Sequence, residues 1–182
     1  AVELSKDSSL TLMSVSVVQN YAKSSVVTEN SGSGGGISSH TSTSIAMEKA
    51  LFEKNTAERN GAALSITSCN AVSIVASQFS SNVAQNDGGS IFLKESSNVK
   101  LQESLVAGNQ AANNGGGISA VLTDLAVRST GIYENIGATG AGISLDMSSM
   151  TFAPPLSDGS NRFAQKVGIV QSSRPINLTT VE

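Results

Sequence analysis

The feature that most constrains the fold of this chain is an internal repeat with a period of about 27 residues. An apolar residue followed three positions later by Asn marks the repeat, at Val17 and Asn20, Phe52 and Asn55, Phe79 and Asn82, Val106 and Asn109, and Ile132 and Asn135. The last four of these asparagines are 27, 27 and 26 residues apart. Supersecondary units that repeat at such a period stack on one another, so the period predicts a solenoid.

Two further sequence patterns keep the same period. Small residues lead into an aliphatic residue at Ile37, Leu64, Ile91, Ile118 and Ile143, which are 27, 27, 27 and 25 residues apart. Pairs of apolar residues two positions apart then follow, and this alternation is typical of β-strands. The first members of these pairs form one expected inward column, namely Leu10, Ile45, Val72, Val99, Leu125, Met150 and Ile176.

The fold class that these patterns predict is an all-β, right-handed, single-stranded parallel β-helix. Each period holds three short apolar strands, and no segment shows the spacing of an amphipathic helix. Residues 1–182 are therefore expected to form one domain of about six coils of about 27 residues, with three strands per coil. Right-handedness follows from the strong preference of parallel strand connections. Asn60-Gly61, Asp87-Gly88 and Asn114-Gly115 are expected to form turns that need positive φ.

Two segments depart from the repeat. Residues 21–33 are expected to form an inserted loop, because the spacing there is eight residues longer than in the next coil. Insertions in solenoids collect at turns and often carry binding, so Tyr21, Val26 and Val27 are candidate contact residues, although a tolerated surface insertion fits equally. Residues 153–161 contain Pro154 and Pro155, which cannot donate to a strand ladder, and are expected to bulge outward as a second loop.

Both ends of the chain match positions in the middle of a coil. Val2 and Leu4 correspond to Ile91 and Leu93, and Ile176 opens a further coil. Uncapped solenoid ends expose unpaired strand edges, which favours association. The chain is therefore expected to be internal to a longer β-helix, or to stack end to end on copies of itself.

The repeated asparagines are expected to form a structural column, because a side-chain amide can donate to the next coil and accept from the previous one. Buried groups left unpaired would each cost about 1 to 3 kcal/mol. A ligand-binding row of exposed amides is the alternative. The column comprises Asn20, Asn55, Asn82, Asn109, Asn135 and Asn161.

Catalytic and metal-binding groups do not converge in the pattern. Asp87, Asp124 and the other aspartates fall at different positions within their coils, so paired carboxylates are not expected. His40, the only histidine, is expected to be solvent-exposed without an acid partner, and Cys69 is a lone cysteine. No catalytic residue, metal or cofactor is predicted. A solvated outward row is expected at Ser38, Ser65, Phe92, Ser119 and Ser144.

Charge and hydropathy exclude further classes. The 11 basic and 14 acidic residues give a net charge of −3 and form no basic stripe, so nucleic-acid binding is not expected. No apolar run approaches the roughly 18 residues that span a bilayer, so direct membrane insertion is not expected. Asn177, in Asn177-Leu178-Thr179, is a possible N-glycosylation site.

The patterns together resemble the repeats of the chlamydial polymorphic outer membrane proteins, in which Phe-x-x-Asn is followed by Gly-Gly and an aliphatic residue. Phe52 to Asn55 and Phe79 to Asn82 match the first element, and Gly35-Gly36-Ile37 and Gly116-Gly117-Ile118 match the second. The likeness runs from Val17 to about Ile143. It implies a right-handed β-helix in the surface-exposed passenger region of an autotransporter, acting in adhesion.

The function expected from the sequence is a non-enzymatic structural or adhesive module of an extracellular or cell-surface protein. Its expected partners are further β-helix coils or copies of itself, and a protein or glycan on the surface of a host or neighbouring cell. One alternative is a self-assembling subunit of an extracellular filament. A second is a non-catalytic part of a carbohydrate-active β-helix enzyme.

Overall fold

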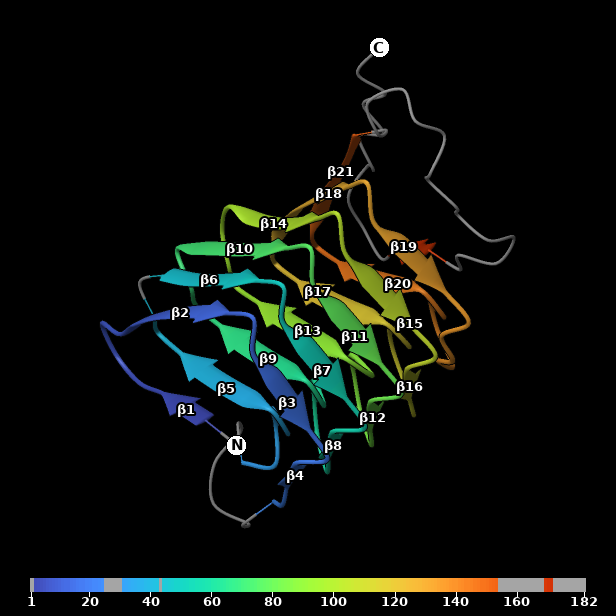
Figure 1. Ribbon diagram of the computed structural model, residues 1–182. Coiled ribbons are helices and arrows are strands. Elements are labelled where there is room, and N and C mark those ends of the chain that lie inside the picture. The colour runs from blue at the N-terminus through green and yellow to red at the C-terminus, as the bar shows by residue number, and fades with distance from the viewer. Residues whose placement is uncertain (1, 25–30, 43, 154–168, 172–182) are drawn as a thin grey trace.

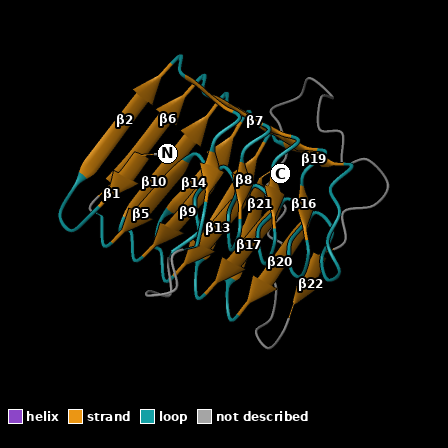
Figure 2. Ribbon diagram, turned by 90° about the horizontal axis from the view of Figure 1, so that it is seen from below, coloured by secondary structure: helices purple, strands orange, loops and turns teal. Residues whose placement is uncertain are grey.

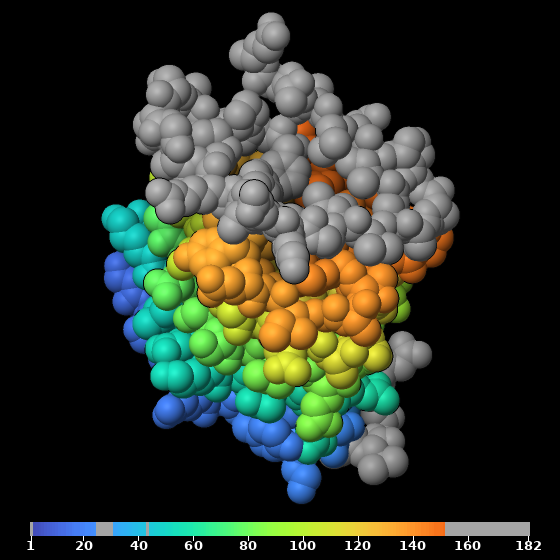
Figure 3. All heavy atoms as spheres, turned by 90° about the vertical axis from the view of Figure 1, so that its right-hand side faces the viewer, coloured from blue at the N-terminus to red at the C-terminus, as the bar shows by residue number. Residues whose placement is uncertain are grey.

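The computed structural model describes residues 2–24, 31–42, 44–153 and 169–171, and these form an all-β parallel solenoid (Figure 1). The chain winds through coils of about 27 residues, and each strand lies beside its equivalent in the next coil. Seen from below, the strands stack as parallel ranks (Figure 2). In the space-filling view the coils lie against one another as successive bands of colour (Figure 3). The solenoid predicted from the repeat is confirmed.

Two sheets contain the longer strands. Sheet A has seven strands, β1 (Val2–Leu4), β5 (Ile37–His40), β9 (Leu64–Thr67), β13 (Ile91–Lys94), β17 (Ile118–Val121), β20 (Ile143–Asp146) and β22 (Ile169–Gln171). Sheet B has six strands, β2 (Ser9–Met13), β6 (Ser44–Glu48), β10 (Ala71–Val75), β14 (Val99–Gln102), β18 (Asp124–Arg128) and β21 (Ser149–Ala153).

Two sheets contain the shorter strands. Sheet C has five, β3 (Ser16–Val18), β7 (Leu51–Glu53), β11 (Gln78–Ser80), β15 (Leu105–Ala107) and β19 (Gly131–Tyr133). Sheet D has four, β4 (Tyr21–Ala22), β8 (Thr56–Ala57), β12 (Val83–Ala84) and β16 (Gln110–Ala111).

The prediction of three strands per coil is wrong, because each complete coil has four. The fourth strand is only two residues long, as in Thr56–Ala57, and so carries no alternation that the sequence could show. Its inward residue is always alanine, at Ala22, Ala57, Ala84 and Ala111. Four coils carry all four strands, and the chain beyond β16 contributes to sheets A, B and C.

The register is the one that the column of apolar residues predicts. Leu10 pairs with Ile45, Val72 with Val99, and Leu125 with Met150 in the parallel ladder of sheet B. Ile176 lies outside the described residues. Sheets A, B and C enclose the main core, in which the rings of Phe52 and Phe79 stack with centroids 5.1 Å apart.

A second, smaller core explains the glycines of the repeat. Ala57, Ala62 and Ala84 pack together where sheet D approaches the segment leading into sheet A. A Cβ atom at Gly35 would lie 2.4 Å from the carbonyl oxygen of Thr56. The small residues before each aliphatic one are therefore required by the close backbone of the fourth sheet.

The corner between sheets D and A uses left-handed glycines, as predicted. Gly61, Gly88 and Gly115 have φ values of 59°, 63° and 63°. This corner also folds onto the outer face of sheet A, where a Cβ at Gly61 would lie 3.0 Å from the Cβ of Phe92.

The expected solvated row on sheet A is wrong for the same reason. Ser65 is 1% exposed, Ser119 is 3% exposed and Phe92 is 8% exposed. Ser144 is also buried, and Ser38 is partly buried. The corner covers this face, so the outward side chains of sheet A are not free surface.

Several predicted features lie outside the described residues. The proline-interrupted segment 153–161 is described only at Ala153, where β21 ends. Asn161 and Asn177 also fall in the part of the chain that is not described.

Candidate functional site

The asparagines of the repeat lie at the corner between sheets C and D and are hydrogen-bonded in one column. Oδ1 of Asn82 accepts from the backbone N–H of Asn55 at 2.9 Å and from Nδ2 of Asn55 at 3.0 Å. Nδ2 of Asn82 donates to the carbonyl oxygen of Phe52 in the preceding coil and to Oδ1 of Asn109 in the next. The same exchange joins Asn20 to Asn55, and Asn109 to Asn135.

These amides are buried and face the interior. Asn55, Asn82 and Asn109 are fully buried, and Asn135 is nearly so. Each side chain satisfies a backbone N–H and a backbone carbonyl that would otherwise lack a partner at the corner. Buried amides cannot also meet an external ligand, so the described members of this column act within the fold.

Two columns of hydroxyl groups do the same at other corners, and the sequence analysis missed them. Between sheets B and C, Oγ of Ser77 accepts from the N–H of Ala50 at 3.1 Å, and Oγ of Ser104 accepts from the N–H of Ser77 at 3.1 Å. Thr130 continues this column. Between sheets A and B the column comprises Cys69, Ser96, Thr123 and Ser148.

The residue before each column member has positive φ. Ser81 precedes Asn82 with φ of 55°, and Ala76 precedes Ser77 with φ of 47°. A left-handed conformation costs a non-glycine residue roughly 1 to 2 kcal/mol. The hydrogen bonds that the following side chain makes to the next coil offset that cost.

Cys69 occupies one of these corner positions. Its backbone N–H donates to Oγ of Ser96, and its Sγ donates to the carbonyl oxygen of Ala71. Burial raises the pKa of the thiol. Cys69 therefore serves as a small corner residue with a protonated thiol, not as a reactive thiolate.

The inserted loop is anchored by Glu58. The hydroxyl of Tyr21 and the backbone N–H of Ser24 both donate to its carboxylate, and the N–H of Arg59 donates to the carbonyl oxygen of Gly32. The bond to Tyr21 lowers the pKa of Glu58 and raises the pKa of Tyr21. Tyr21 is 54% exposed, whereas Val26 and Val27 lie outside the described residues.

His40 is half-buried on the outer face of sheet A, not freely exposed as expected. Its Nε2 lies 3.2 Å from Oγ of Ser38, while its Nδ1 is buried and has no hydrogen-bond partner. Burial lowers the pKa of His40, and the carboxylate of Glu3 partly opposes this shift. Because Nδ1 is not held by an acid, this serine and histidine lack the third group that orients a catalytic base.

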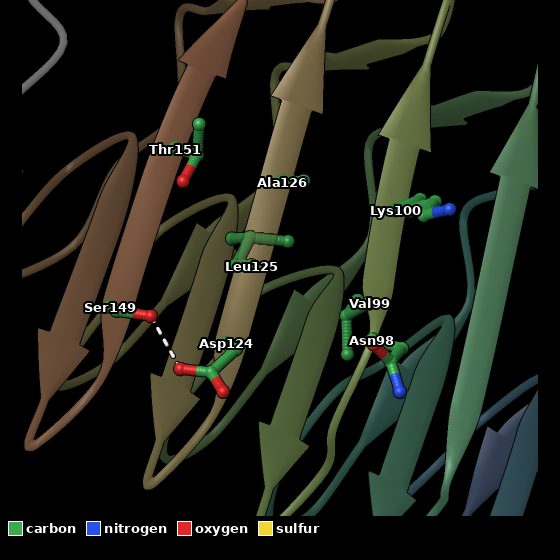
Figure 4. Close-up of a pocket in the computed structure, with 8 residues that line it drawn as sticks. All are labelled: Asn98, Val99, Lys100, Asp124, Leu125, Ala126, Ser149 and Thr151. Carbon is green, nitrogen blue, oxygen red and sulfur yellow. Dashed lines mark hydrogen bonds between the residues drawn. The ribbon is translucent and has the colours of Figure 1, made fainter. Parts of the chain in front are cut away.

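A hollow of about 170 Å³ lies on the outer face of sheet B, across β14, β18 and β21 (Figure 4). The methyl group of Ala126 lies in its middle, between Lys100 and Thr151 on the neighbouring strands. Asn98, Asp124 and Ser149 line one side, and the Ser149 hydroxyl donates to the Asp124 carboxylate. This is the polar concave site that the structure brings together from residues of three coils.

Comparison with known proteins gives no family. The chain matches no protein-family model, and neither a curated protein nor a solved structure shows significant similarity to it. What the chain shares with other proteins is thus the solenoid architecture itself. No helix in the described part of the chain is long and apolar enough to cross a membrane.

Proposed function

We propose that this chain is a non-enzymatic structural or adhesive module of an extracellular or cell-surface protein. The observation that carries the proposal is the set of buried hydrogen-bond columns that join one coil to the next at three corners. Interior polar groups there are used to hold neighbouring coils together. A stiff rod of this kind serves to position the surfaces along its length.

The repeat is of the type found in polymorphic outer membrane proteins, and the roles of its residues support this reading. The phenylalanines of Phe-x-x-Asn stack in the core, and the asparagines form the C–D corner. The paired small residues fit beneath the backbone of sheet D. Each element of the motif thus has a defined task within the coil. The solenoid is right-handed, in keeping with the rule for parallel strand connections.

The surfaces available for adhesion are the outer faces that the corners leave open. The D–A corner covers the outer face of sheet A. Sheet B instead carries exposed small and polar residues such as Thr11, Ala46 and Lys100. The same face holds the hollow around Ala126. Sheet B is therefore the face assigned to contact with a partner.

Two measurements test the proposal. Antibodies raised against the chain should stain intact cells that make the protein, and staining only after permeabilisation would refute a surface location. Beads coated with the chain should adhere to neighbouring or host cells, and adherence should fall when soluble chain is added as a competitor. Release of sugars from polysaccharide by the purified chain would contradict the non-enzymatic role.

A further inference from the structure

We propose that the hollow on the outer face of sheet B is a binding site for one sugar unit of a glycan, held through adjacent hydroxyl groups. This inference rests on the proposed adhesive function and names the class of partner. The site is formed by Asn98, Lys100, Asp124, Ala126, Ser149 and Thr151.

The shape of the site follows from one small residue in a row of larger ones. Along the middle row of sheet B, Lys100, Ala126 and Thr151 are neighbours in successive strands. Ala126 ends at its Cβ, so the space above it is bounded by the side chains one coil away on either side (Figure 4). The hollow, about 170 Å³, is small and open to one side, which suits a single sugar ring better than a peptide segment.

The acceptors of the site lie together along one side. One oxygen of Asp124 accepts from the Ser149 hydroxyl, which leaves the remaining capacity of the carboxylate for a ligand. Asn98 uses Nδ2 to donate to the carbonyl oxygen of Asn70 at 3.3 Å, so its Oδ1 is turned to acceptor duty. Strands in a sheet are about 4.8 Å apart, so these two acceptors sit at a separation that neighbouring hydroxyl groups of one ring can span.

The donors of the site lie along the other side. The hydroxyl of Thr151 is exposed, and the ammonium group of Lys100 points away from Asp124 (Figure 4). A ligand that both donates and accepts at neighbouring atoms satisfies this set, and a polyol does so at every hydroxyl.

Charge disfavours the other ligand classes. One carboxylate and one ammonium line the site, so neither an anion nor a cation meets a field of one sign. A single carboxylate with a lysine two strand positions from Asn98 is also a poor set for a divalent cation, which prefers several oxygens. A neutral sugar is the ligand that this arrangement favours.

The test uses amide chemical shifts of the isotope-labelled chain during titration with methyl glycosides of glucose, galactose, mannose and N-acetylglucosamine. At least one of them should cause saturable shifts at Asn98, Asp124 and Ala126. Ala126→Leu should fill the hollow and weaken that binding by at least about tenfold. Ala46→Leu is the matched control, because Ala46 lies in the same row three strands away, and it should leave binding unchanged.

Either of two results would overturn the inference. One is the absence of saturable shifts with every sugar, or shifts only with calcium or with a lysine-containing peptide. The other is equal binding by Ala126→Leu and the native chain. Failure here is separable from failure of the adhesive role: beads carrying Ala126→Leu that still adhere to cells would refute the site alone. Sugar binding by a chain that does not adhere would refute the adhesive role alone.

Discussion

The side chain of Asn82 receives two hydrogen bonds from Asn55, one coil earlier, at the backbone N–H and at Nδ2, both on Oδ1. The same amide gives its own Nδ2 protons to the carbonyl oxygen of Phe52 and to Asn109. One residue therefore connects three successive coils through a single buried group. The stability of the rod depends on this exchange more than on any surface ion pair, since those present join exposed neighbours in sequence such as Lys54 and Glu53.

Replacing Asn82 by alanine is expected to destabilise the chain severely. The change leaves the N–H of Asn55 and the carbonyl oxygen of Phe52 buried and unpaired, and each such group costs about 1 to 3 kcal/mol. The free energy of unfolding, measured in urea, should fall by roughly 2 to 6 kcal/mol. Asn70→Ala, at an exposed position, is the control. A loss at residue 82 no larger than the loss at residue 70 would show that the column contributes little.

Replacing Ala50 by serine is expected to stabilise the chain. Ala50 lies at the position where Ser77, Ser104 and Thr130 carry the hydroxyl column, and its N–H donates to Oγ of Ser77. A hydroxyl at residue 50 would accept from the N–H of Val15 by the same geometry. The expected gain in unfolding free energy is about 0.5 to 1.5 kcal/mol. Ser104→Ala should lose a comparable amount, and a loss on Ala50→Ser would contradict the account.

The register of this fold could be predicted because apolar residues recur at a fixed period. Val72 and Val99 lie in adjacent strands as their spacing requires, and no other register would keep both inside. The fourth sheet could not be predicted, because Thr56–Ala57 is too short to alternate. The hydroxyl columns were equally hidden, since serine is common throughout this chain and Ser77 stands out only once its register is known.

The surface was harder to predict than the core. Ser65 and Phe92 alternate with inward residues, so the sequence assigns them to solvent, yet the D–A corner covers them. The hollow on sheet B was also missed. It arises from the small size of Ala126 relative to Lys100 and Thr151, and these residues are distant in sequence. Contacts of this kind depend on how corners fold and on neighbours one coil away, which a strand pattern does not contain.

The stability of the chain is expected to fall as the pH drops below about 6.5, the ordinary pKa of histidine. Burial lowers the pKa of His40 in the folded chain, against the partial opposition of Glu3. Just below pH 6.5 the unfolded chain therefore binds more protons than the folded one, so the unfolding free energy must rise with pH in this window. The urea midpoint should be lower near pH 5.5 than near pH 7.5. His40→Asn should reduce that difference, and an unchanged difference would exclude His40 as its source.

Gly88 and Gly108 offer a matched test of why glycine is needed at the D–A corner. Both have φ of 63°, so alanine at either position carries the same backbone strain. A Cβ at Gly108 would meet nothing within 4 Å, whereas a Cβ at Gly88 would lie 2.4 Å from the carbonyl oxygen of Ile91. Gly108→Ala should therefore lower the unfolding free energy by only about 1 to 2 kcal/mol, the cost of the left-handed conformation.

Gly88→Ala should cost clearly more than Gly108→Ala, because the carbonyl that it would displace belongs to sheet A and the adjoining backbone is paired with the next coil. Urea denaturation of the two variants side by side measures the difference directly. Equal losses would mean that the corner relaxes freely, and that the glycine there serves the dihedral angle alone. A larger loss for Gly88→Ala would show that close approach of the corner to sheet A, and not turn geometry, selects the residue at this position.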